Sequence, residues 1–331
     1  MYKNFIQSLN QILNPDEWTE NPNEIKPYLI EERKYFFGKS KLLLKPDTSL
    51  KVQKIVKLCY TNNISLVPQG GRTGLCGGTI PSSGKEVLLS LEKLNKIHKI
   101  DTTNFSMLVD SGCILKDIQE AAIAKNRFFP LSLASEGSCT IGGNLSTNAG
   151  GINVLRYGMA RDLVLGLKVV MPNGSIISRL SDLRKDNRGY DLKQLFIGAE
   201  GTLGIITTIN LKIFPLPKEN CTCLIALKSP LEAIKFFSFL RENIGEMISA
   251  FELISKSALN MVLKNIPNVT KPFQKNYNWY VLIEFSWMQS SGLKEIVNPL
   301  LNQCLEDNAI YDAIIANSIK QSKNLWKLRE S

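Results

Sequence analysis

Histidine is almost absent from this sequence, because His98 is the only one among 331 residues. It falls in the alternating segment 96–101, which predicts a β-strand. A single histidine in a strand is typical of a surface or hydrogen-bonded residue and not of a catalyst. Zinc sites draw on several His, Cys and carboxylate side chains in close array. We therefore expect that these residues form no metal site and that His98 tethers no cofactor.

Cysteine is present but lacks the spacing of a cysteine framework. The seven cysteines are odd in number and contain no C-x-x-C pair, so neither a disulfide scaffold nor a zinc site is indicated. Cys221 and Cys223 are predicted to share one face of a strand, as small apolar residues. This usage favours a reducing compartment, and we expect the cytoplasm.

Long apolar runs and long charged runs are also missing. No stretch reaches membrane-spanning length, and the N-terminal region has no apolar segment typical of a signal peptide. Asp16, Glu17 and Glu20 come early, which also argues against a transit peptide. The formal charge is +10, but no tract of five or more basic residues occurs, so nucleic-acid binding is not indicated. The positive charge favours some attraction for an anionic ligand.

The patterns that are present indicate a folded protein of about two domains. Hydrophobic residues make up 44% of the chain, enough for a sizeable core. Strand and helix patterns alternate from residue 42 onward, and Pro172-Asn173-Gly174 predicts a hairpin. We predict a helical preamble over 1–35, a cofactor-binding domain over 36–217 and a further domain over 218–331.

Glycine is concentrated in two clusters, at 70–78 and 137–151. Neither matches a phosphate-binding P-loop, and Arg72 breaks the dinucleotide pattern G-x-G-x-x-G. Paired glycines allow positive φ angles and a close approach to the main chain, and successive amides in such a turn can hold a pyrophosphate. One alternative is a pair of ordinary surface loops. We favour two loops that bind one long phosphate-bearing cofactor between subdomains.

These clusters resemble the FAD-binding domain of the vanillyl-alcohol oxidase and p-cresol methylhydroxylase superfamily. The resemblance is carried by Pro68-Gln69-Gly70-Gly71-x-Thr73-Gly74-x-x-Gly77-Gly78, by the whole segment 137–151 and by Arg156-Tyr157-Gly158. The run 184–207 is similar to the D-2-hydroxyglutarate dehydrogenase branch. The resemblance implies an α+β fold, with an FAD-binding domain of two α/β subdomains followed by an incomplete α/β cap domain.

The resemblance also implies which residues bind FAD, without a covalent link. The first cluster would hold the pyrophosphate, the second would line the adenosine and flavin regions, and a third segment would close the far end. Arg72 stands where asparagine is expected, and either contacts a phosphate or points to solvent. The complete cofactor set is Pro68, Gly70, Gly71, Arg72, Thr73, Gly74, Gly77, Gly137, Ser138, Ile141, Gly142, Gly143, Asn144, Thr147, Asn148, Ala149, Gly150, Glu200, Gly201 and Ile206.

The segment Leu325-Trp326-x-Leu328-Arg329-Glu330 resembles the part of the cap whose arginine holds the substrate carboxylate. Arg329 is therefore the predicted substrate residue, with a surface arginine as the alternative. The family's metal-binding histidines and catalytic Glu-His have no counterpart here. No catalytic residue is assigned, and we expect the chain to be an incomplete version of the family.

The function implied is FAD-dependent oxidation of a D-2-hydroxy acid, most like D-2-hydroxyglutarate. D-lactate or glycolate oxidation is one alternative, and a flavin-binding remnant or half of a split enzyme is another. The implied partners are the 2-hydroxy acid and an electron acceptor, such as an electron-transfer flavoprotein or a quinone. A complementing chain or a second copy of this chain is a further option.

Overall fold

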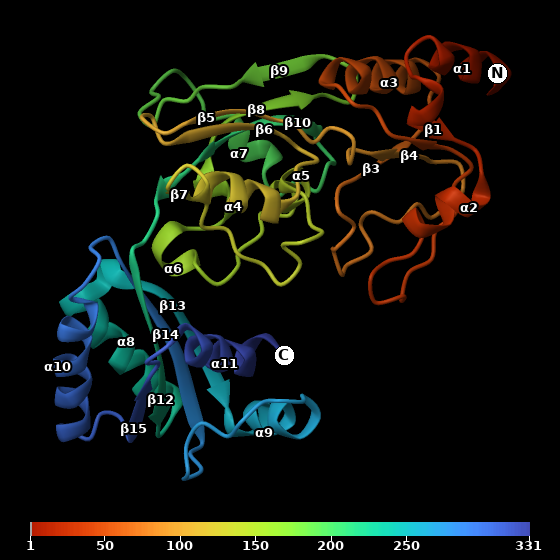
Figure 1. Ribbon diagram of the computed structural model, residues 1–331. Coiled ribbons are helices and arrows are strands. Elements are labelled where there is room, and N and C mark those ends of the chain that lie inside the picture. The colour runs from red at the N-terminus through yellow and green to blue at the C-terminus, as the bar shows by residue number, and fades with distance from the viewer. Residues whose placement is uncertain (1) are drawn as a thin grey trace. The chain divides into compact units, whose positions relative to one another are not determined.

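The computed structural model describes residues 2–331 and divides the chain into two compact units. Of the described residues, the first unit contains 2–130, 135–149 and 159–214, and the second contains 131–134, 150–158 and 215–331. Each unit has its own sheets and helices (Figure 1). The fold is α+β, as predicted.

The first unit begins with a four-stranded sheet in the order β1-β2-β4-β3. Its strands are β1 (Trp18–Thr19), β2 (Leu43–Leu44), β3 (Leu66–Gln69) and β4 (Val87–Ser90). The last three run parallel. Helix α3 (Ser49–Thr61) connects β2 to β3 and begins at an N-cap, where Thr48 accepts a hydrogen bond from the Lys51 amide. Its apolar stripe, Val52, Ile55, Val56 and Cys59, is buried against α1 (Tyr2–Asn10) and the sheet. The short segments η1 (Pro15–Glu17), α2 (Pro22–Ile25) and η2 (Lys26–Tyr28) lie between α1 and β2 in the chain.

A five-stranded antiparallel sheet follows, in the order β5-β6-β10-β8-β9. Its strands are β5 (Ile97–Asp101), β6 (Ser106–Asp110), β8 (Val164–Val170), β9 (Ile176–Arg179) and β10 (Ile205–Lys212). The predicted hairpin at 172–174 joins β8 to β9, with Gly174 at φ +81°. The helical segments are α4 (Leu115–Ile123), α5 (Ile141–Ser146), η3 (Ala160–Leu163) and α7 (Lys193–Phe196), and β7 (Arg127–Phe128) pairs with β11 (Phe214–Pro215).

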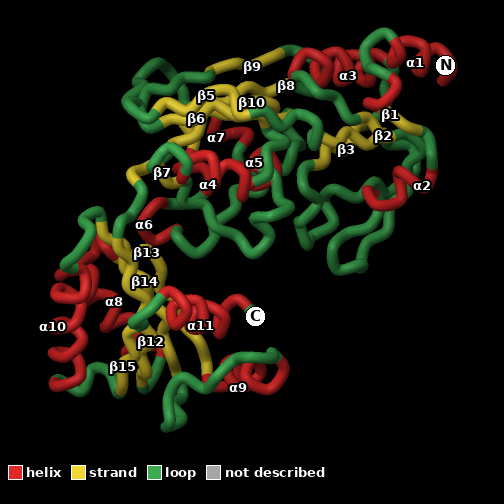
Figure 2. Tube along the Cα trace, in the orientation of Figure 1, coloured by secondary structure: helices red, strands yellow, loops and turns green. Residues whose placement is uncertain are grey.

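The second unit is one four-stranded antiparallel sheet in the order β13-β14-β12-β15, covered on both faces by helices (Figure 2). Its strands are β12 (Glu219–Leu227), β13 (Ile248–Ser255), β14 (Trp279–Trp287) and β15 (Asp312–Ile315). Alternate residues of β12 face opposite sides. Cys221, Cys223 and Ile225 pack with α8 (Pro230–Ile244) and α10 (Leu293–Glu306), while Leu224 and Ala226 pack with α9 (Lys256–Asn265) and α11 (Ile319–Glu330). The short α6 (Val154–Tyr157) contacts β13, and η4 (Gly245–Met247) follows α8.

One element differs from expectation, because the second glycine cluster is not simply a loop. Residues Ile141–Ser146 form helix α5, although two of the six are glycine. Glycine weakens a helix by about 1 kcal/mol relative to alanine. The close approach to a neighbouring strand end offsets this, because the Gly142 amide donates to the Ser111 carbonyl at 2.8 Å. A Cβ on Gly142 would lie 2.5 Å from the Ser111 Cβ, so only glycine fits.

Candidate functional site

The two glycine clusters meet each other in the first unit. A Cβ added to Gly70 would lie 2.4 Å from Thr140 Oγ1, and one added to Gly71 would lie 2.2 Å from the Ser138 carbonyl oxygen. Side chains at either position would therefore push the clusters apart. These two glycines are required first by protein packing, which places the loop after β3 against the N-terminus of α5.

A cavity of about 480 Å³ lies where the clusters meet, and it is formed entirely by the first unit. Its walls come from the end of β3, the loop 70–79, α5 and the segment that enters β10. Nine of the residues predicted to bind the cofactor line it: Pro68, Gly70, Gly74, Gly142, Gly143, Thr147, Glu200, Gly201 and Ile206. We call this space the cofactor cavity.

A second hollow of about 870 Å³ lies beside the cofactor cavity. The two share the lining residues Pro68, Gly201, Gly204 and Ile205. The second hollow is bordered by the C-terminal turn of α3 and the start of β3. The four shared residues therefore border both spaces.

The polar atoms of the cofactor cavity indicate what would fit there. Gln69 Oε1, Ser111 Oγ and Thr140 Oγ1 are buried and have no hydrogen-bond partner among residues 2–331. Buried polar atoms are almost always paired, so three such atoms in one cavity indicate a bound polar ligand. FAD carries ribityl and ribose hydroxyls, phosphate oxygens and ring N–H groups, which together can satisfy such atoms.

The glycines that remain open show where that ligand would lie. A Cβ on Gly74 would meet nothing within 4 Å, and one on Gly143 would have its nearest neighbour, Thr140 Oγ1, at 3.4 Å. Both residues line the cofactor cavity. The protein thus leaves room that these glycines do not fill, so the residues present fit FAD.

The other predicted cofactor residues do not line this cavity. Ile141 and Asn144 are buried in α5, and the side-chain Nδ2 of Asn144 donates to Cys139 Sγ at 3.4 Å. Gly77, at φ +75°, packs on the Phe36 ring, and Gly150 belongs to the second unit. The full set outside the lining is Gly71, Arg72, Thr73, Gly77, Gly137, Ser138, Ile141, Asn144, Asn148, Ala149 and Gly150.

Arg72 packs on neighbouring side chains and does not simply point to solvent, while its predicted contact to a phosphate stays a prediction. Its guanidinium lies over the Tyr28 ring, 4.1 Å from the centroid, and its Nη1 is 3.6 Å from Glu92 Oε2. The Tyr28 hydroxyl also donates to Glu92 at 2.8 Å. Burial, together with this bond to a carboxylate, raises the pKa of Tyr28 to about 12. Arg72 therefore braces the glycine loop against the preceding segment.

Several lining residues were missed from the sequence. Gln69 stands directly before the first glycine pair, and that position was an available signal. Ser111 is contributed by the end of β6, and no local pattern marks it. The other missed residues are Leu75, Cys76, Gly78, Thr79, Leu91, Gly204 and Ile205, whereas Thr140 and Ser146 lie in the second glycine cluster, where polar side chains are expected to bond to the cofactor.

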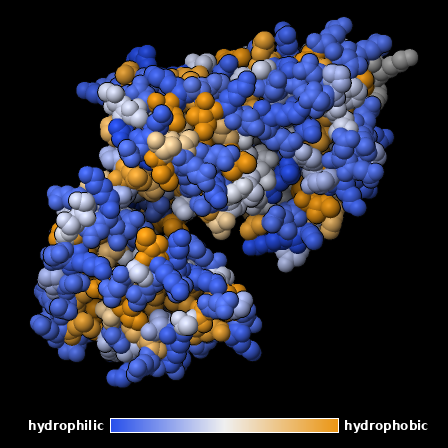
Figure 3. Space-filling model, in the orientation of Figure 1, coloured by the Kyte–Doolittle hydropathy of each residue, from blue (hydrophilic) through white to orange (hydrophobic). Residues whose placement is uncertain are grey.

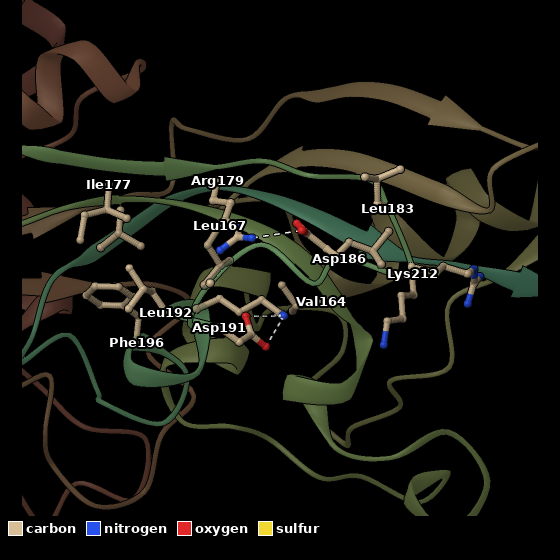
Figure 4. Close-up of a pocket in the computed structure, with 15 residues that line it drawn as sticks. Val164, Leu167, Ile177, Arg179, Leu183, Asp186, Asp191, Leu192, Phe196 and Lys212 are labelled. Carbon is tan, nitrogen blue, oxygen red and sulfur yellow. Dashed lines mark hydrogen bonds and ion pairs between the residues drawn. The ribbon is translucent and has the colours of Figure 1, made fainter.

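A separate cavity of about 210 Å³ lies in the first unit between β8, β9 and α7 (Figure 4). Arg179 Nη2 pairs with Asp186 at 3.1 Å, and Lys193 pairs with Asp191 at 2.6 Å. Burial, with help from nearby Arg184 and Lys193, lowers the pKa of Lys212. None of the predicted cofactor residues lines this cavity. Its ion pairs hold the loop 180–192, which overlaps the motif run 184–207.

Arg329, the predicted substrate residue, lies on α11 in the second unit. Its Nε donates to Glu252 Oε2 on β13 at 2.8 Å, and its side chain is 38% exposed. The bond through Nε orients the guanidinium. Within the described residues 2–331, the two terminal nitrogens form no hydrogen bond or ion pair.

His98 and the cysteines are placed as the sequence predicts. His98 lies in β5, and its Nε2 is 2.9 Å from Asp110 Oδ1. Cys221 and Cys223 are buried on one face of β12, with their sulfurs 3.8 Å apart. All seven cysteines are free.

Among residues 2–331, no group of three or more His, Cys, Asp or Glu side chains is arranged to hold a metal ion, and no helix is long and apolar enough to cross a membrane.

Comparison with known protein families agrees with this site. The family described as FAD binding domain matches residues 40–179, and the family described as FAD linked oxidases, C-terminal domain, matches residues 216–331. The chain therefore belongs to the FAD-linked oxidases.

Among individual relatives, the chain is 35% identical over 325 residues to the mitochondrial D-2-hydroxyglutarate dehydrogenase of Arabidopsis thaliana, covering 98% of this chain and 58% of that protein. It is 35% identical over 330 residues to the D-2-hydroxyglutarate–pyruvate transhydrogenase of Saccharomyces cerevisiae, covering all of this chain and 66% of that protein. The chain thus spans between half and two thirds of these relatives. A crystal structure of p-cresol methylhydroxylase with substrate bound has the same fold, with a TM-score of 0.76 at 17% identity, over 99% of this chain and 72% of that one.

Proposed function

We propose that the protein is an FAD-dependent dehydrogenase that oxidises a D-2-hydroxy acid, with D-2-hydroxyglutarate as the favoured substrate. The observation that carries the proposal is the cofactor cavity, where three unpartnered buried oxygens and two open glycines lie together. The substrate class is supported by the names of the two relatives above.

The residues of the cavity would hold the cofactor without a covalent link. Loop 70–79 would supply main-chain amides to the phosphates, and Gln69, Ser111 and Thr140 would bond to polar groups. Apolar Ile206 would pack on a flat ring. The cofactor would supply the acceptor for the hydride of the hydroxyl-bearing carbon, and the hydroxyl proton would pass to water.

Arg329 would bind a carboxylate of the substrate. A guanidinium offers five N–H donors in a planar fork, and the bond from Nε to Glu252 leaves the terminal pair available. Glu252 would then act as a positioning residue, since it holds the fork in one orientation. The electron acceptor in this proposal is an electron-transfer flavoprotein or a quinone.

The proposed compartment is a reducing one, and we favour the cytoplasm. The free cysteines support a reducing environment. Of the two relatives described above, the Arabidopsis thaliana protein is named as mitochondrial. The mitochondrial matrix is therefore the other compartment to test. Fractionation of cells that express the tagged chain separates the two.

Anaerobic titration of the flavin-loaded protein with 2-hydroxy acids tests the proposal. We expect D-2-hydroxyglutarate to change the flavin absorbance more than D-lactate, glycolate or L-2-hydroxyglutarate does. Arg329→Ala should remove the change, because a charge-assisted bidentate contact contributes roughly 1.5–3 kcal/mol. Lys327→Ala, a neighbouring cation that bonds to the Pro267 carbonyl, is the matched control and should respond as the wild type. An unchanged response in Arg329→Ala would show that this residue does not bind the substrate.

A further inference from the structure

Three consecutive aromatic residues are exposed in a loop of the first unit. Tyr35 is 75% exposed, Phe36 46% and Phe37 68%. We call residues 33–37 the aromatic tip. Single exposed apolar residues are common on protein surfaces, whereas several together mark an interaction site. The loops after α2 and β3 hang at the lower edge of the first unit in Figure 1, and hydrophobic patches interrupt the hydrophilic surface at that edge in Figure 3.

The aromatic tip is held in a defined turn by a buried carboxylate. Glu31 is 2% exposed, and its carboxylate accepts hydrogen bonds from the amides of Arg33 at 2.9 Å and Tyr35 at 3.1 Å. Its own amide donates to the Phe36 carbonyl at 3.2 Å, and Lys34 adopts φ +60°. The buried Glu31 side chain therefore holds a turn that presents aromatic rings to the outside.

Cations flank the aromatic rings on both sides. Arg33 and Lys34 precede them, and Lys39 and Lys41 follow, against one exposed carboxylate, Glu32. None of these four cations forms an ion pair within residues 2–331. Their charges are thus free to meet an anionic partner.

We propose that the aromatic tip docks onto the surface of an anionic lipid bilayer. Aromatic rings flanked by Lys and Arg suit a membrane interface, where the rings enter the boundary with the acyl chains and the cations meet lipid phosphates. A protein partner fits less well, because a stable protein interface takes about 20–30 residues on each side. The net charge of +10 would also steer the protein toward an anionic surface.

The aromatic tip adjoins the cofactor loop. The Phe36 ring is the nearest neighbour of the space beside Gly77, where an added Cβ would lie 2.8 Å from the ring. Loop 74–79 lines the cofactor cavity. Docking would therefore bring the cavity wall close to the bilayer and to an acceptor dissolved in it. This last consequence rests on the proposed function, whereas docking itself does not.

Sedimentation with lipid vesicles tests the docking. The wild-type chain should co-sediment with vesicles of phosphatidylcholine and phosphatidylglycerol, less with phosphatidylcholine alone, and less as salt increases. Tyr35→Ser/Phe37→Ser should lower the partition coefficient at least about tenfold. Tyr60→Ser/Ile234→Ser is the matched control, since these side chains are 64% and 66% exposed elsewhere, and it should bind as the wild type. Lys34→Glu/Lys39→Glu should weaken binding only to the anionic vesicles.

Flavin content and thermal unfolding of each variant separate docking from folding and from cofactor binding. Both should equal the wild-type values in the Tyr35→Ser/Phe37→Ser variant. Vesicle binding without bound flavin would overturn the proposed function and leave the docking intact. Wild-type protein that stays in the supernatant with anionic vesicles at low salt would overturn the docking. The docking would also be overturned if Tyr35→Ser/Phe37→Ser bound vesicles as the wild type does and lost only its binding to a purified electron-transfer flavoprotein.

Discussion

Two clusters of buried polar groups, one in each unit, differ in how completely they are paired. In the cofactor cavity of the first unit, Gln69, Ser111 and Thr140 each leave a buried oxygen without a partner. In the sheet of the second unit, the Glu284 carboxylate accepts bonds from Trp326 Nε1 at 2.7 Å and from Thr222 Oγ1 at 3.1 Å. Thr222 also bonds to Ser322 at 2.7 Å.

We interpret the first cluster as a ligand-binding site and the second as a cluster that stabilises the fold. An unpaired buried hydroxyl costs free energy, whereas a paired one contributes about 1 kcal/mol. The Glu284 cluster joins β12, β14 and α11, and so holds the helix that carries Arg329. The cavity oxygens have no hydrogen-bond partner within the described residues 2–331, and we expect the cofactor to supply one.

The largest expected effect is the loss of flavin from Gly143→Val. The structure has room for a Cβ at this position, so the larger side chain would occupy cofactor space with little harm to the fold. Flavin affinity should fall at least about tenfold, which corresponds to about 1.4 kcal/mol. Absorbance at the flavin and protein bands measures the flavin content. Gly245→Val, at a helical glycine with φ −50° outside the cavity, is the control. Full flavin content in Gly143→Val would place the cofactor elsewhere.

A matched pair of Thr→Val substitutions should separate the two kinds of polar group. Thr222→Val removes two hydrogen bonds and leaves part of the Glu284 carboxylate unsatisfied, which should cost roughly 1–3 kcal/mol of unfolding free energy. Thr140→Val removes a hydroxyl that has no partner, and should leave the apo protein as stable as before. Thr140→Val should instead weaken flavin binding. Denaturant unfolding of the apo proteins measures the first two effects, and equal destabilisation by both would remove the contrast.

The smallest effect concerns the pH dependence set by Glu284. Burial raises the pKa of this carboxyl above its ordinary value of 4.5, and the bonds from Trp326 and Thr222 only partly oppose the shift. Because the folded state then binds the proton more tightly, this group makes stability fall as pH rises from 4.5 through the raised pKa. Glu284→Gln should flatten that slope, by less than about 1.4 kcal/mol per pH unit. Thermal unfolding followed as a function of pH, from about pH 4 upward, provides the test. An unchanged slope would mean that another group titrates.

Much of the fold could be predicted because its signals are local. The hairpin at 172–174 and the shared face of Cys221 and Cys223 follow from turn residues and periodicity within a few positions. The glycine clusters are local signals too, and nine of the residues that they and the 184–207 run predicted line one cavity.

What could not be predicted depends on contacts between distant segments. Ser111 enters the cavity because its carbonyl accepts from the Gly142 amide, 31 positions away in the chain. Arg72 is held by Tyr28 and Glu92, and Arg329 is oriented by Glu252, 77 positions away. Helix α5 forms despite its glycines because the same strand end packs on it. No short pattern in the sequence records these pairings.

The most direct test of the account is the visible spectrum of the purified chain, before and after denaturation. The cofactor cavity predicts a yellow protein with about one flavin per chain, all of it released to the supernatant as FAD when the protein is precipitated. A colourless protein that takes up no added FAD would contradict the central claim. Flavin that remains with the precipitate would show a covalent link and contradict the mode of binding proposed here.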